Sequence, residues 1–320
     1  MARMARCAAF AGSLAAGLTA CANPIIQLRP VPSGAQGISL LGDTLWAAPI
    51  APGEGPPLVR QLQAAQRTLQ SKPADPAARM LVARRTAALG RIREAVELYT
   101  GILADDRGRA RVYRRRGEML FLIRELGLAE RDLRRAVKSP ATKVEKEFTE
   151  DLVGGLAGTS LGYRANLILG AVRYARGEFG GAVESLVEAL RFSDGADELT
   201  ESGLWLSIAL LRAGRGAEAA GVIRGIPGNL DVRRRGPELA LLRLFKGELP
   251  IDSLRILADS GPEDEALYLF GLGLVHLLRG ERQAGAILFE EVLRLGVWQT
   301  WSAIAAESEL ARMGPAAPRR

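Results

Sequence analysis

Small and apolar residues recur at helical spacing in two runs between residues 169 and 190. The first run ends at Gly177, which can adopt the positive φ that closes a helix. Ala182 and Ala189 lie on the near face of the second run, where small side chains let two helix axes approach closely. A bulkier residue at Ala182 is expected to overpack this crossing at a cost of about 1–3 kcal/mol. The stretch therefore predicts one helical hairpin.

The same pattern recurs along most of the chain. The turn glycine is found at five positions, the last four of which are 37, 33 and 33 residues apart: Gly90, Gly177, Gly214, Gly247 and Gly280. A small residue follows five positions later in most units, and a large apolar residue four positions after that. One further unit lacks the turn glycine but keeps Gly117, Ala129, Leu133 and Ala136 in matching places. Six units are therefore predicted, starting near Pro76, Ala110, Tyr163, Thr200, Arg233 and Ala266.

A period near 34 residues in helical pairs resembles that of the tetratricopeptide repeat (TPR) family. The resemblance covers about residues 76–299, and the best matches to the family consensus are Leu169-Gly170, Ala182, Leu186, Ala189, Leu272-Gly273 and Phe289. The consensus proline at the end of the unit is mostly missing, and Asp252 replaces the small residue of the fifth unit. The resemblance implies an all-α fold, a TPR-like α-solenoid of about six helix-turn-helix repeats. Such repeats serve many unrelated partners, so the fold alone names no function.

The sequence around the repeats sets the predicted organisation. Residues 144–162 are first charged and then glycine-rich, which predicts a long loop or a partly helical excursion. Trp301, Ile304 and Leu310 fall at helical spacing after the last unit, which predicts a terminal cap of the stack. The chain is predicted to contain a capping helix (58–75), repeats 1–2 (76–143), an insertion loop (144–162), repeats 3–6 (163–299), a second capping helix (300–313) and a disordered tail (314–320).

The N-terminus resembles an export signal. Arg3 and Arg6 precede a short apolar segment, residues 7–16, that cannot span a bilayer. Leu18-Thr19-Ala20-Cys21 then resembles the lipobox of bacterial lipoproteins. The resemblance implies a lipoprotein signal peptide at 1–20 and an acylated Cys21. The alternative is a generic signal peptide with a chance cysteine.

Lipidation would leave the mature protein without a free thiol or a disulfide. Cys7 leaves with the signal peptide, and the sulfur of Cys21 becomes a thioether. Two or three acyl chains would hold the protein stably on its membrane. Ala22 rather than an aspartate follows the cysteine, which in Gram-negative bacteria favours the outer membrane, facing the periplasm. The alternative location is the outer leaflet of the cytoplasmic membrane.

The segment 21–57 is predicted to be a flexible tether. It contains seven prolines and five glycines, a composition that does not sustain a helix or a packed strand. We therefore expect it to hold the repeats off the membrane. Four large apolar residues interrupt it, and docking on the repeats is favoured over a short contact motif for Leu40, Leu41, Leu45 and Trp46.

The formal net charge is +7, and removing Arg3 and Arg6 leaves 41 basic and 36 acidic residues, about +5. Arginines cluster at 111–116, 131–135 and 233–235. A nucleic-acid partner is not expected, because the export signal argues against it and the basic residues are interleaved with acidic ones. The clusters fit either a solvated helix face or a surface for an acidic, carboxylate-bearing partner.

The TPR resemblance implies where a partner would bind, because the first helix of each unit lines the concave face in that family. Carrying over the usual concave positions gives Arg84, Arg111, Arg114, Phe121, Arg164, Tyr174, Arg212, Arg234 and Phe270. Arginines with intervening aromatics suit a peptide that carries carboxylates. The asparagine-and-lysine clamp of the cytosolic chaperone-binding members is not present, so their C-terminal-peptide partners are not implied.

One motif points to catalysis. Residues 158–162 match the G-x-S-x-G nucleophile elbow, which requires a strand that turns sharply into a helix beneath an α/β sheet. No strand is expected before it, so Ser160 is predicted to cap a helix that begins near Leu161. A hydrolase would need His276, the only histidine, as its base. We expect His276 to be packed or half-buried, and we expect no metal or cofactor, because the sequence has no zinc-ligand set and no phosphate-binding glycine loop.

The predicted function is therefore a membrane-anchored protein-interaction scaffold of the bacterial cell envelope, without enzymatic activity. It would bind a peptide or protein partner in the concave groove. The alternatives are a carbohydrate-binding envelope lipoprotein, which the low aromatic content of 5% disfavours, and a serine hydrolase using Ser160.

Overall fold

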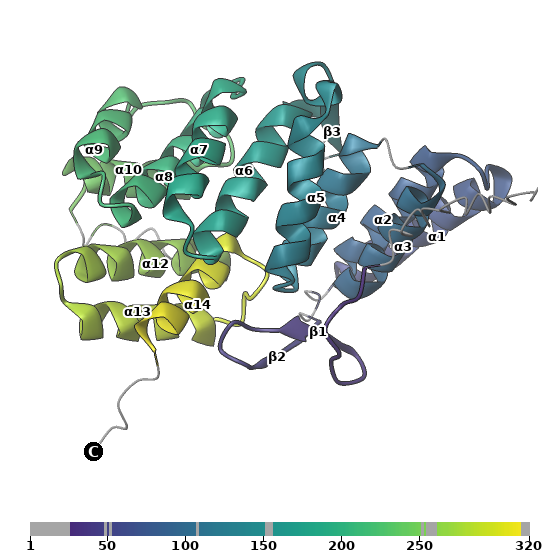
Figure 1. Ribbon diagram of the computed structural model, residues 1–320, viewed down its shortest axis with the longest axis horizontal. Coiled ribbons are helices and arrows are strands. Elements are labelled where there is room, and N and C mark those ends of the chain that lie inside the picture. Colours follow the sequence, from purple (N-terminus) through teal and green to yellow (C-terminus); the bar gives the residue numbers. More distant parts are fainter. Residues whose placement is uncertain are drawn as a thin grey trace, which may run out of the picture.

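The computed structural model describes residues 26–47, 50, 53–106, 109–150, 156–250, 253 and 261–314. These residues form an array of antiparallel helix pairs, as Figure 1 shows. The helices are α1 Gly55–Ser71, α2 Pro76–Ala88, α3 Ile92–Asp105, α4 Ala110–Leu122, α5 Leu126–Lys138, α6 Leu161–Ala175, α7 Phe179–Arg191, α8 Ala196–Arg212, α9 Gly216–Gly225, α10 Gly236–Lys246, α12 Pro262–Leu278, α13 Arg282–Arg294 and α14 Trp301–Met313. The fold is a TPR-like α-solenoid, as the sequence predicts.

Each hairpin turns on a residue with a positive φ. The five predicted turn glycines all adopt this conformation, with φ between 73° and 81°, so this prediction is confirmed. In the unit without a turn glycine, Arg124 takes the position with a φ of 63°. It is the one non-glycine residue with a positive φ in the described part of the chain. A side chain is disfavoured by roughly 1–2 kcal/mol in this region of φ/ψ space, so its retention at the turn needs a reason.

Close contact between paired helices explains the small residues of the repeat. A Cβ atom added to Gly170 of α6 would lie 2.5 Å from Cγ of Leu186 in α7. One added to Gly273 of α12 would lie 2.6 Å from Cε1 of Phe289 in α13. Ala182 is fully buried at the same crossing as Gly170. The small residues of the repeat therefore lie where the axes of the paired helices approach closely.

The segment between repeats two and three differs from the predicted loop or helical excursion. After a short 3-10 helix, Pro140–Lys143, it forms a β-hairpin. Strand β3 (Lys146–Glu150) pairs antiparallel with β4 (Leu156–Ser160), and Lys146 lies opposite Ser160. Cross-strand pairing satisfies the backbone polar groups of a segment that has too little apolar periodicity to predict a strand.

The segment Ile26–Ala47 also differs from the prediction. We call it the N-terminal strap, because it lies across the repeats instead of forming a free tether. It contains β1 (Ala35–Ile38) and β2 (Thr44–Trp46), which pair antiparallel. Leu45 is buried, whereas Leu41 and Trp46 remain 42% and 53% exposed. Cys21, the predicted signal peptide and residues 315–320 lie outside the described residues.

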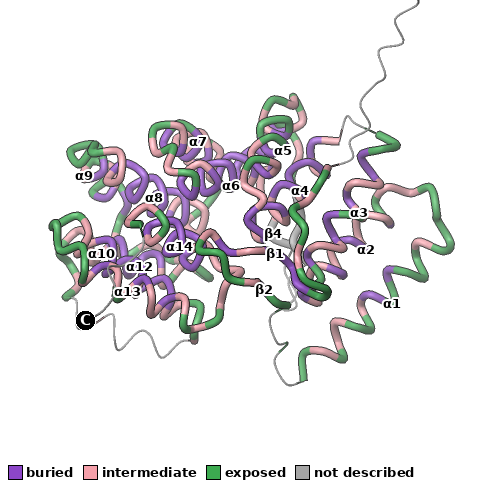
Figure 2. The backbone as a smooth tube through the Cα atoms, turned by 60° about the horizontal axis from the view of Figure 1, so that its bottom comes forward, coloured by how far each residue is buried: buried purple, intermediate pink, exposed green. Residues whose placement is uncertain are grey.

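The last helix, α14, does more than cap the end of the stack. It contacts α12 and α13 of the last unit and also α6, on the inner side of the solenoid. Every residue from Ser302 to Glu309 is buried, as the purple tube of Figure 2 indicates. A terminal cap would expose one face of the helix to solvent. Instead, α14 is covered on all sides over two turns.

Candidate functional site

The inner face of the solenoid is divided into two parts, and α14 fills the first. Trp301, at the start of α14, meets Phe121 of α4 edge to face with ring centroids 6.1 Å apart. It meets Trp205 of α8 at 5.8 Å. Phe270 of α12 stacks on Trp205 at 6.0 Å. The aromatic residues of four helices are therefore packed into one core around the first turn of α14.

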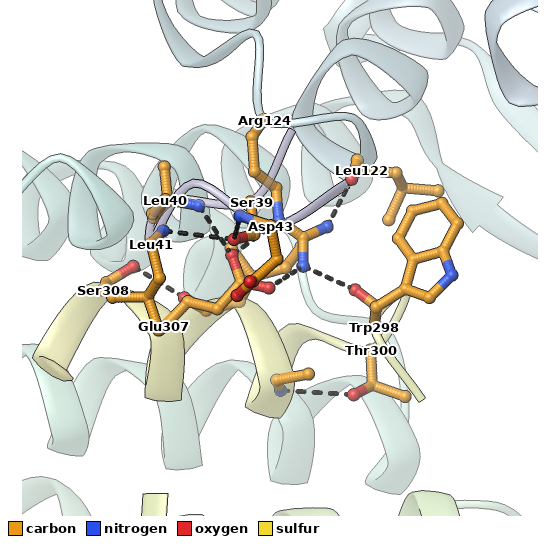
Figure 3. A network of polar contacts seen from close by, with 12 residues as sticks. Ser39, Leu40, Leu41, Asp43, Leu122, Arg124, Trp298, Thr300, Glu307 and Ser308 are labelled. Atoms are coloured by element: carbon orange, nitrogen blue, oxygen red, sulfur yellow. Dashed lines mark hydrogen bonds and ion pairs between the residues drawn. The ribbon is translucent and has the colours of Figure 1, made fainter. Parts of the chain in front are cut away.

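An ion pair fixes the middle of α14 to the unusual turn of the second unit (Figure 3). The Arg124 guanidinium donates to Glu307 through Nε at 3.0 Å and through Nη2 at 2.5 Å. The same Nη2 donates to the carbonyl oxygen of Trp298 at 2.7 Å. Both side chains are buried, with 0% and 3% of their surface exposed. The residue that replaces glycine at this turn therefore joins the second unit to the C-terminal helix.

The N-terminal strap is joined to the same pair. The backbone N–H of Leu40 donates to Oε2 of Glu307 at 3.1 Å (Figure 3). Residues from the strap, the second unit and the C-terminal helix thus meet at one carboxylate, although Leu40 and Glu307 are 267 positions apart. Such a network is strong only while every member is satisfied.

A second buried carboxylate, Glu309, receives hydrogen bonds from the third and fourth units. The Tyr174 hydroxyl donates to its Oε1 at 2.6 Å, and Arg212 donates through Nε and Nη2 at 2.9 Å each. Arg312 approaches the same carboxylate at 2.9 Å. Burial, followed by the Glu309 charge, raises the pKa of Tyr174 well above 10.0. Tyr174 therefore stays protonated and donates.

These contacts correct the predicted binding groove. Phe121, Tyr174, Arg212 and Phe270 lie on the inner face, but α14 and its neighbours cover them. Phe121, Tyr174 and Phe270 are 0–2% exposed. A separate partner cannot reach these three side chains in this structure, so the prediction of an open groove is wrong at these positions. These three rings therefore present no exposed aromatic face to a ligand.

The second part of the inner face is open. Here a cavity of about 430 Å³, which we call the charged hollow, lies beside α4, β4, α6, the start of α8 and the segment before α10. Arg114, Arg164 and Arg234, three of the predicted binding residues, all line it. The structure therefore brings together three arginines that are 120 residues apart along the chain (Arg114 to Arg234).

Two glutamates neutralise the deep part of the charged hollow. Glu118 pairs with Arg114 at 2.6 Å and with Arg164 at 3.3 Å. Burial alone would raise the pKa of Glu118, but Arg114, Arg164 and Arg115 outweigh it and hold the pKa below its ordinary value. Glu118 therefore remains a carboxylate at neutral pH and holds its arginine partners in place.

Glu201 has the same role on the opposite wall. Its Oε1 pairs with Arg235 at 2.8 Å and with Arg164 at 3.7 Å, and its Oε2 accepts from the Tyr163 hydroxyl at 2.9 Å. Arg235 also pairs with Glu238 at 2.7 Å. Burial would lower the pKa of Arg235, but these two carboxylates raise it instead. The wall of the hollow is thus a fixed network of alternating charges.

The mouth of the hollow presents two exposed arginines. Oδ1 of Asp197, in the first turn of α8, accepts the backbone N–H of Arg233 at 2.9 Å and that of Arg234 at 3.1 Å. These two bonds hold the backbone before α10, while both arginine side chains stay exposed. A guanidinium on a fixed backbone can donate to an incoming carboxylate with little loss of conformational freedom.

Two predicted residues lie elsewhere. Arg111 of α4 pairs with Glu145 at 3.1 Å and donates to the carbonyl oxygen of Lys146 at 3.2 Å, so it holds the base of the β-hairpin. Arg84 lies half-buried on α2. Neither belongs to the lining of the charged hollow.

Sequence reasoning missed Arg124, Glu307 and Glu309. A signal for Arg124 exists, because it stands five residues before Ala129, where the other units have their turn glycine. The two glutamates lie within the run Trp301–Leu310, among small and apolar residues. Acidic residues in such a run need buried cationic partners.

The possible hydrolase is not assembled. Contrary to expectation, a strand does precede Ser160, since β4 runs directly into α6. That strand belongs to a two-stranded hairpin and not to an α/β sheet. Ser160 Oγ accepts the N–H of Tyr163 at 3.3 Å, which confirms the predicted helix cap. His276 is half-buried near the end of α12 and contacts Glu281, and α12 lies far from the hairpin in Figure 1.

Two further kinds of feature are absent from the described residues. Within those ranges, histidine, cysteine, aspartate and glutamate do not gather in threes as a metal site requires. None of the helices described is both long and apolar enough to cross a membrane.

Comparisons with known proteins assign no function to the chain. No family model and no curated protein matches the chain. A solved tetratricopeptide repeat protein from Parabacteroides merdae ATCC 43184 is 14% identical over 78% of this chain and 92% of its own, with a TM-score of 0.49. YrrB, described as a TPR protein with an unusual peptide-binding site, is 13% identical over 73% and 93%, with a TM-score of 0.43. MamA is 17% identical over 59% and 85%, with a TM-score of 0.41. These similarities concern helical architecture alone.

Proposed function

We propose that this protein is an interaction scaffold that binds an acidic segment of a protein partner at the charged hollow. The observation that supports this most directly is the fixed backbone position of two exposed arginines, Arg233 and Arg234. Both line the charged hollow, on a part of the inner face that α14 does not cover. Arg233 and Arg234 are exposed to solvent, so the first contact of a partner falls at the mouth.

Several features favour a peptide over a small metabolite. The hollow lies beside the β-hairpin and is continuous with solvent at Arg233 and Arg234. Its walls are ion-paired helices that do not need to reorganise on binding, which lowers the cost of association. Arg233 and Arg234 would each pair with a carboxylate of the partner, and such exposed pairs weaken with salt.

The proposal is tested by photo-crosslinking. A photoreactive residue placed at Ala196, which lines the hollow, is expected to give one dominant protein adduct in the cells that make this protein. The adduct should be lost when Arg233→Glu and Arg234→Glu are combined. The matched control is Arg67→Glu, a charge reversal on an exposed residue of α1. An adduct that survives the double reversal, or no adduct from Ala196, contradicts the proposal.

We also propose that the scaffold is anchored through acylated Cys21 to the outer membrane, facing the periplasm. The support is the basic start, the short apolar segment and the lipobox-like Leu18–Cys21. Cys21→Ala should release the protein from membranes washed at high salt, and separation of the two membranes should place the unmodified protein in the outer one. Retention of the variant after the wash would remove the lipid anchor from the proposal.

A further inference from the structure

The strap begins its contacts with the repeats very close to the proposed lipid anchor. Ile26 and Leu28 pack against the apolar core shared by α3, α4, α5 and α6. Arg29 donates its backbone N–H to Oε1 of Glu125 at 2.9 Å and its Nη2 to the Arg124 carbonyl oxygen at 2.8 Å. Arg93 of α3 donates to the Arg29 carbonyl oxygen at 2.7 Å. The strap is thus held by the folded body from its first described residues.

Contacts along the rest of the strap make this attachment firm. The backbone N–H of Arg93 donates to Gln36 at 3.1 Å, Gly37 lies so close to Ile123 that an added Cβ would be 2.6 Å from its carbonyl oxygen, and Leu40 donates to buried Glu307. The strap therefore contacts the first unit, the second unit and the C-terminal helix. Dissociation of the strap from the repeats would break the buried hydrogen bonds at Glu307.

Covalent geometry then limits the height of the body above the membrane. Ile26 follows Cys21 by five positions, and a fully extended chain spans at most about 18 Å over that distance. A free tether over the predicted 21–57 would instead have a root-mean-square length of about 33 Å and a much longer maximum reach. The docked strap removes most of that length.

The surface around Ile26 is therefore the one that must lie near lipid. Ile26, Gln27 and Leu28 share a cavity of about 530 Å³ with residues of α3, including Arg93 and Glu97. Helix α9 lies at the opposite end of the solenoid, as Figure 1 shows. An anchor on the α3 side of an elongated body gives α3 and α9 different distances from the bilayer.

We propose that the N-terminal strap holds the solenoid against the phospholipid surface in a defined orientation, with the α3 side toward the headgroups and α9 away from them. The proposal rests on the lipid anchor at Cys21. The charged hollow, with Arg233 and Arg234 at its mouth, is thereby held at a fixed distance from the bilayer. A long flexible tether would let this distance vary.

The test uses energy transfer from single labelled positions to acceptors on the lipid headgroups. The full-length precursor is acylated in a bacterial host, purified and placed in phospholipid vesicles. One new cysteine at a time is introduced at Gln27, Glu97 or Ala217, which are exposed positions of the strap, α3 and α9. Each is the one free thiol of the mature chain, because Cys7 is removed and the Cys21 sulfur is acylated. Transfer is expected to decrease in the order Gln27, Glu97, Ala217.

A matched variant changes only the tether length. Insertion of 20 glycine and serine residues between Ala22 and Asn23 adds a flexible segment of about 25 Å root-mean-square length and leaves the described part of the strap intact. Transfer should fall at all three positions, and the difference between Glu97 and Ala217 should disappear as the body becomes free to rotate.

The outcomes separate this inference from the proposals on which it rests. A protein that washes off the vesicles has no lipid anchor, and both proposals about the membrane then fail. A protein that stays bound but gives equal transfer from Glu97 and Ala217 overturns the orientation alone. If the difference survives the insertion, direct surface contact sets the orientation and the strap does not. None of these outcomes bears on the crosslinking at Ala196.

Discussion

The covered part of the inner face and the charged hollow use the same helices for opposite purposes. Helix α6 contributes Tyr174 to the contact with α14 and Arg164 to the wall of the hollow, three turns apart on one helix. In the covered part, arginines meet glutamates that come from a distant helix and are wholly buried. In the hollow, they meet glutamates from neighbouring repeats, and solvent reaches the mouth.

This difference shows that one chemical pattern, arginines with interspersed aromatics, does not by itself indicate binding. Where α14 covers the inner face, these arginines and aromatic residues form part of the core. Where no helix of the chain covers the face, the arginines remain accessible to a partner. The two parts should therefore respond in opposite ways to substitution: the first in stability, the second in partner capture.

The largest effect is expected for Glu307→Ala. The substitution leaves the Arg124 guanidinium buried without its carboxylate, which costs about 3–5 kcal/mol in the free energy of unfolding. Urea unfolding followed by circular dichroism measures the loss. The control is Glu188→Ala, which breaks an exposed pair with Arg191 and should cost less than about 0.5 kcal/mol. Equal unfolding curves for Glu307→Ala and the natural protein would mean that α14 is not held as described.

A double variant sharpens this result. Arg124→Gly with Glu307→Ala removes both charges and restores the glycine that the other turns have. It should recover part of the stability that Glu307→Ala loses, because no buried charge remains and a glycine favours the positive φ.

A smaller effect is expected for Gly170→Ala, in the helix that serves both parts. The new Cβ would lie 2.5 Å from Cγ of Leu186, so the α6–α7 crossing must widen at a cost of about 1–3 kcal/mol. Gly221→Ala in α9 is the control, since an added Cβ there has no neighbour within 4 Å. It should raise helix stability by about 0.5–1 kcal/mol. Thermal unfolding of the two variants should therefore shift in opposite directions.

Tyr174→Phe should lower the free energy of unfolding by about 1–2 kcal/mol at neutral pH, because the Glu309 carboxylate keeps its arginine partners but loses one donor.

This effect should depend on pH. Since the pKa of Tyr174 is raised by burial and then by Glu309, the unfolded chain releases this proton above pH 10 and the native chain does not. The stability from Tyr174 is therefore complete below pH 10 and is lost as the pH rises above it, by about 1.4 kcal/mol per pH unit. Unfolding measured from pH 8 to pH 11 should show the gap between the natural protein and the variant closing. A constant gap would contradict the buried neutral tyrosine.

The smallest effect on stability is expected at the mouth of the hollow. Arg233→Glu with Arg234→Glu should change the free energy of unfolding by no more than about 0.5 kcal/mol, because both side chains are exposed and Asp197 holds their backbone. The same variant should abolish the crosslinked adduct. A large loss of stability would place these arginines in the framework and not in a binding site.

The sequence alone predicts the repeats because their cause is local. A turn glycine must follow one helix, and a small residue must face the next, so Gly177 and Ala182 recur at a fixed spacing that can be counted. The same spacing locates the first helices of the units and hence the inner face. It also brings Arg114, Arg164 and Arg234 onto that face, although it cannot say which of the predicted residues remain open.

What the sequence did not determine is where its two ends fold back. The position of α14 depends on the contact of Glu307 with Arg124 and on that of Glu309 with Tyr174. These contacts join residues 183 and 135 positions apart, so the periodicity of the repeats does not predict them. The strap depends on Leu40 reaching the same glutamate, and its prolines and glycines predict only that no helix forms there. Short-range spacing fixes the solenoid because each repeat packs on its neighbour. Only the tertiary structure shows which part of the inner face α14 covers. The coverage depends on ion pairs and aromatic contacts between residues that become neighbours only in the folded superhelix.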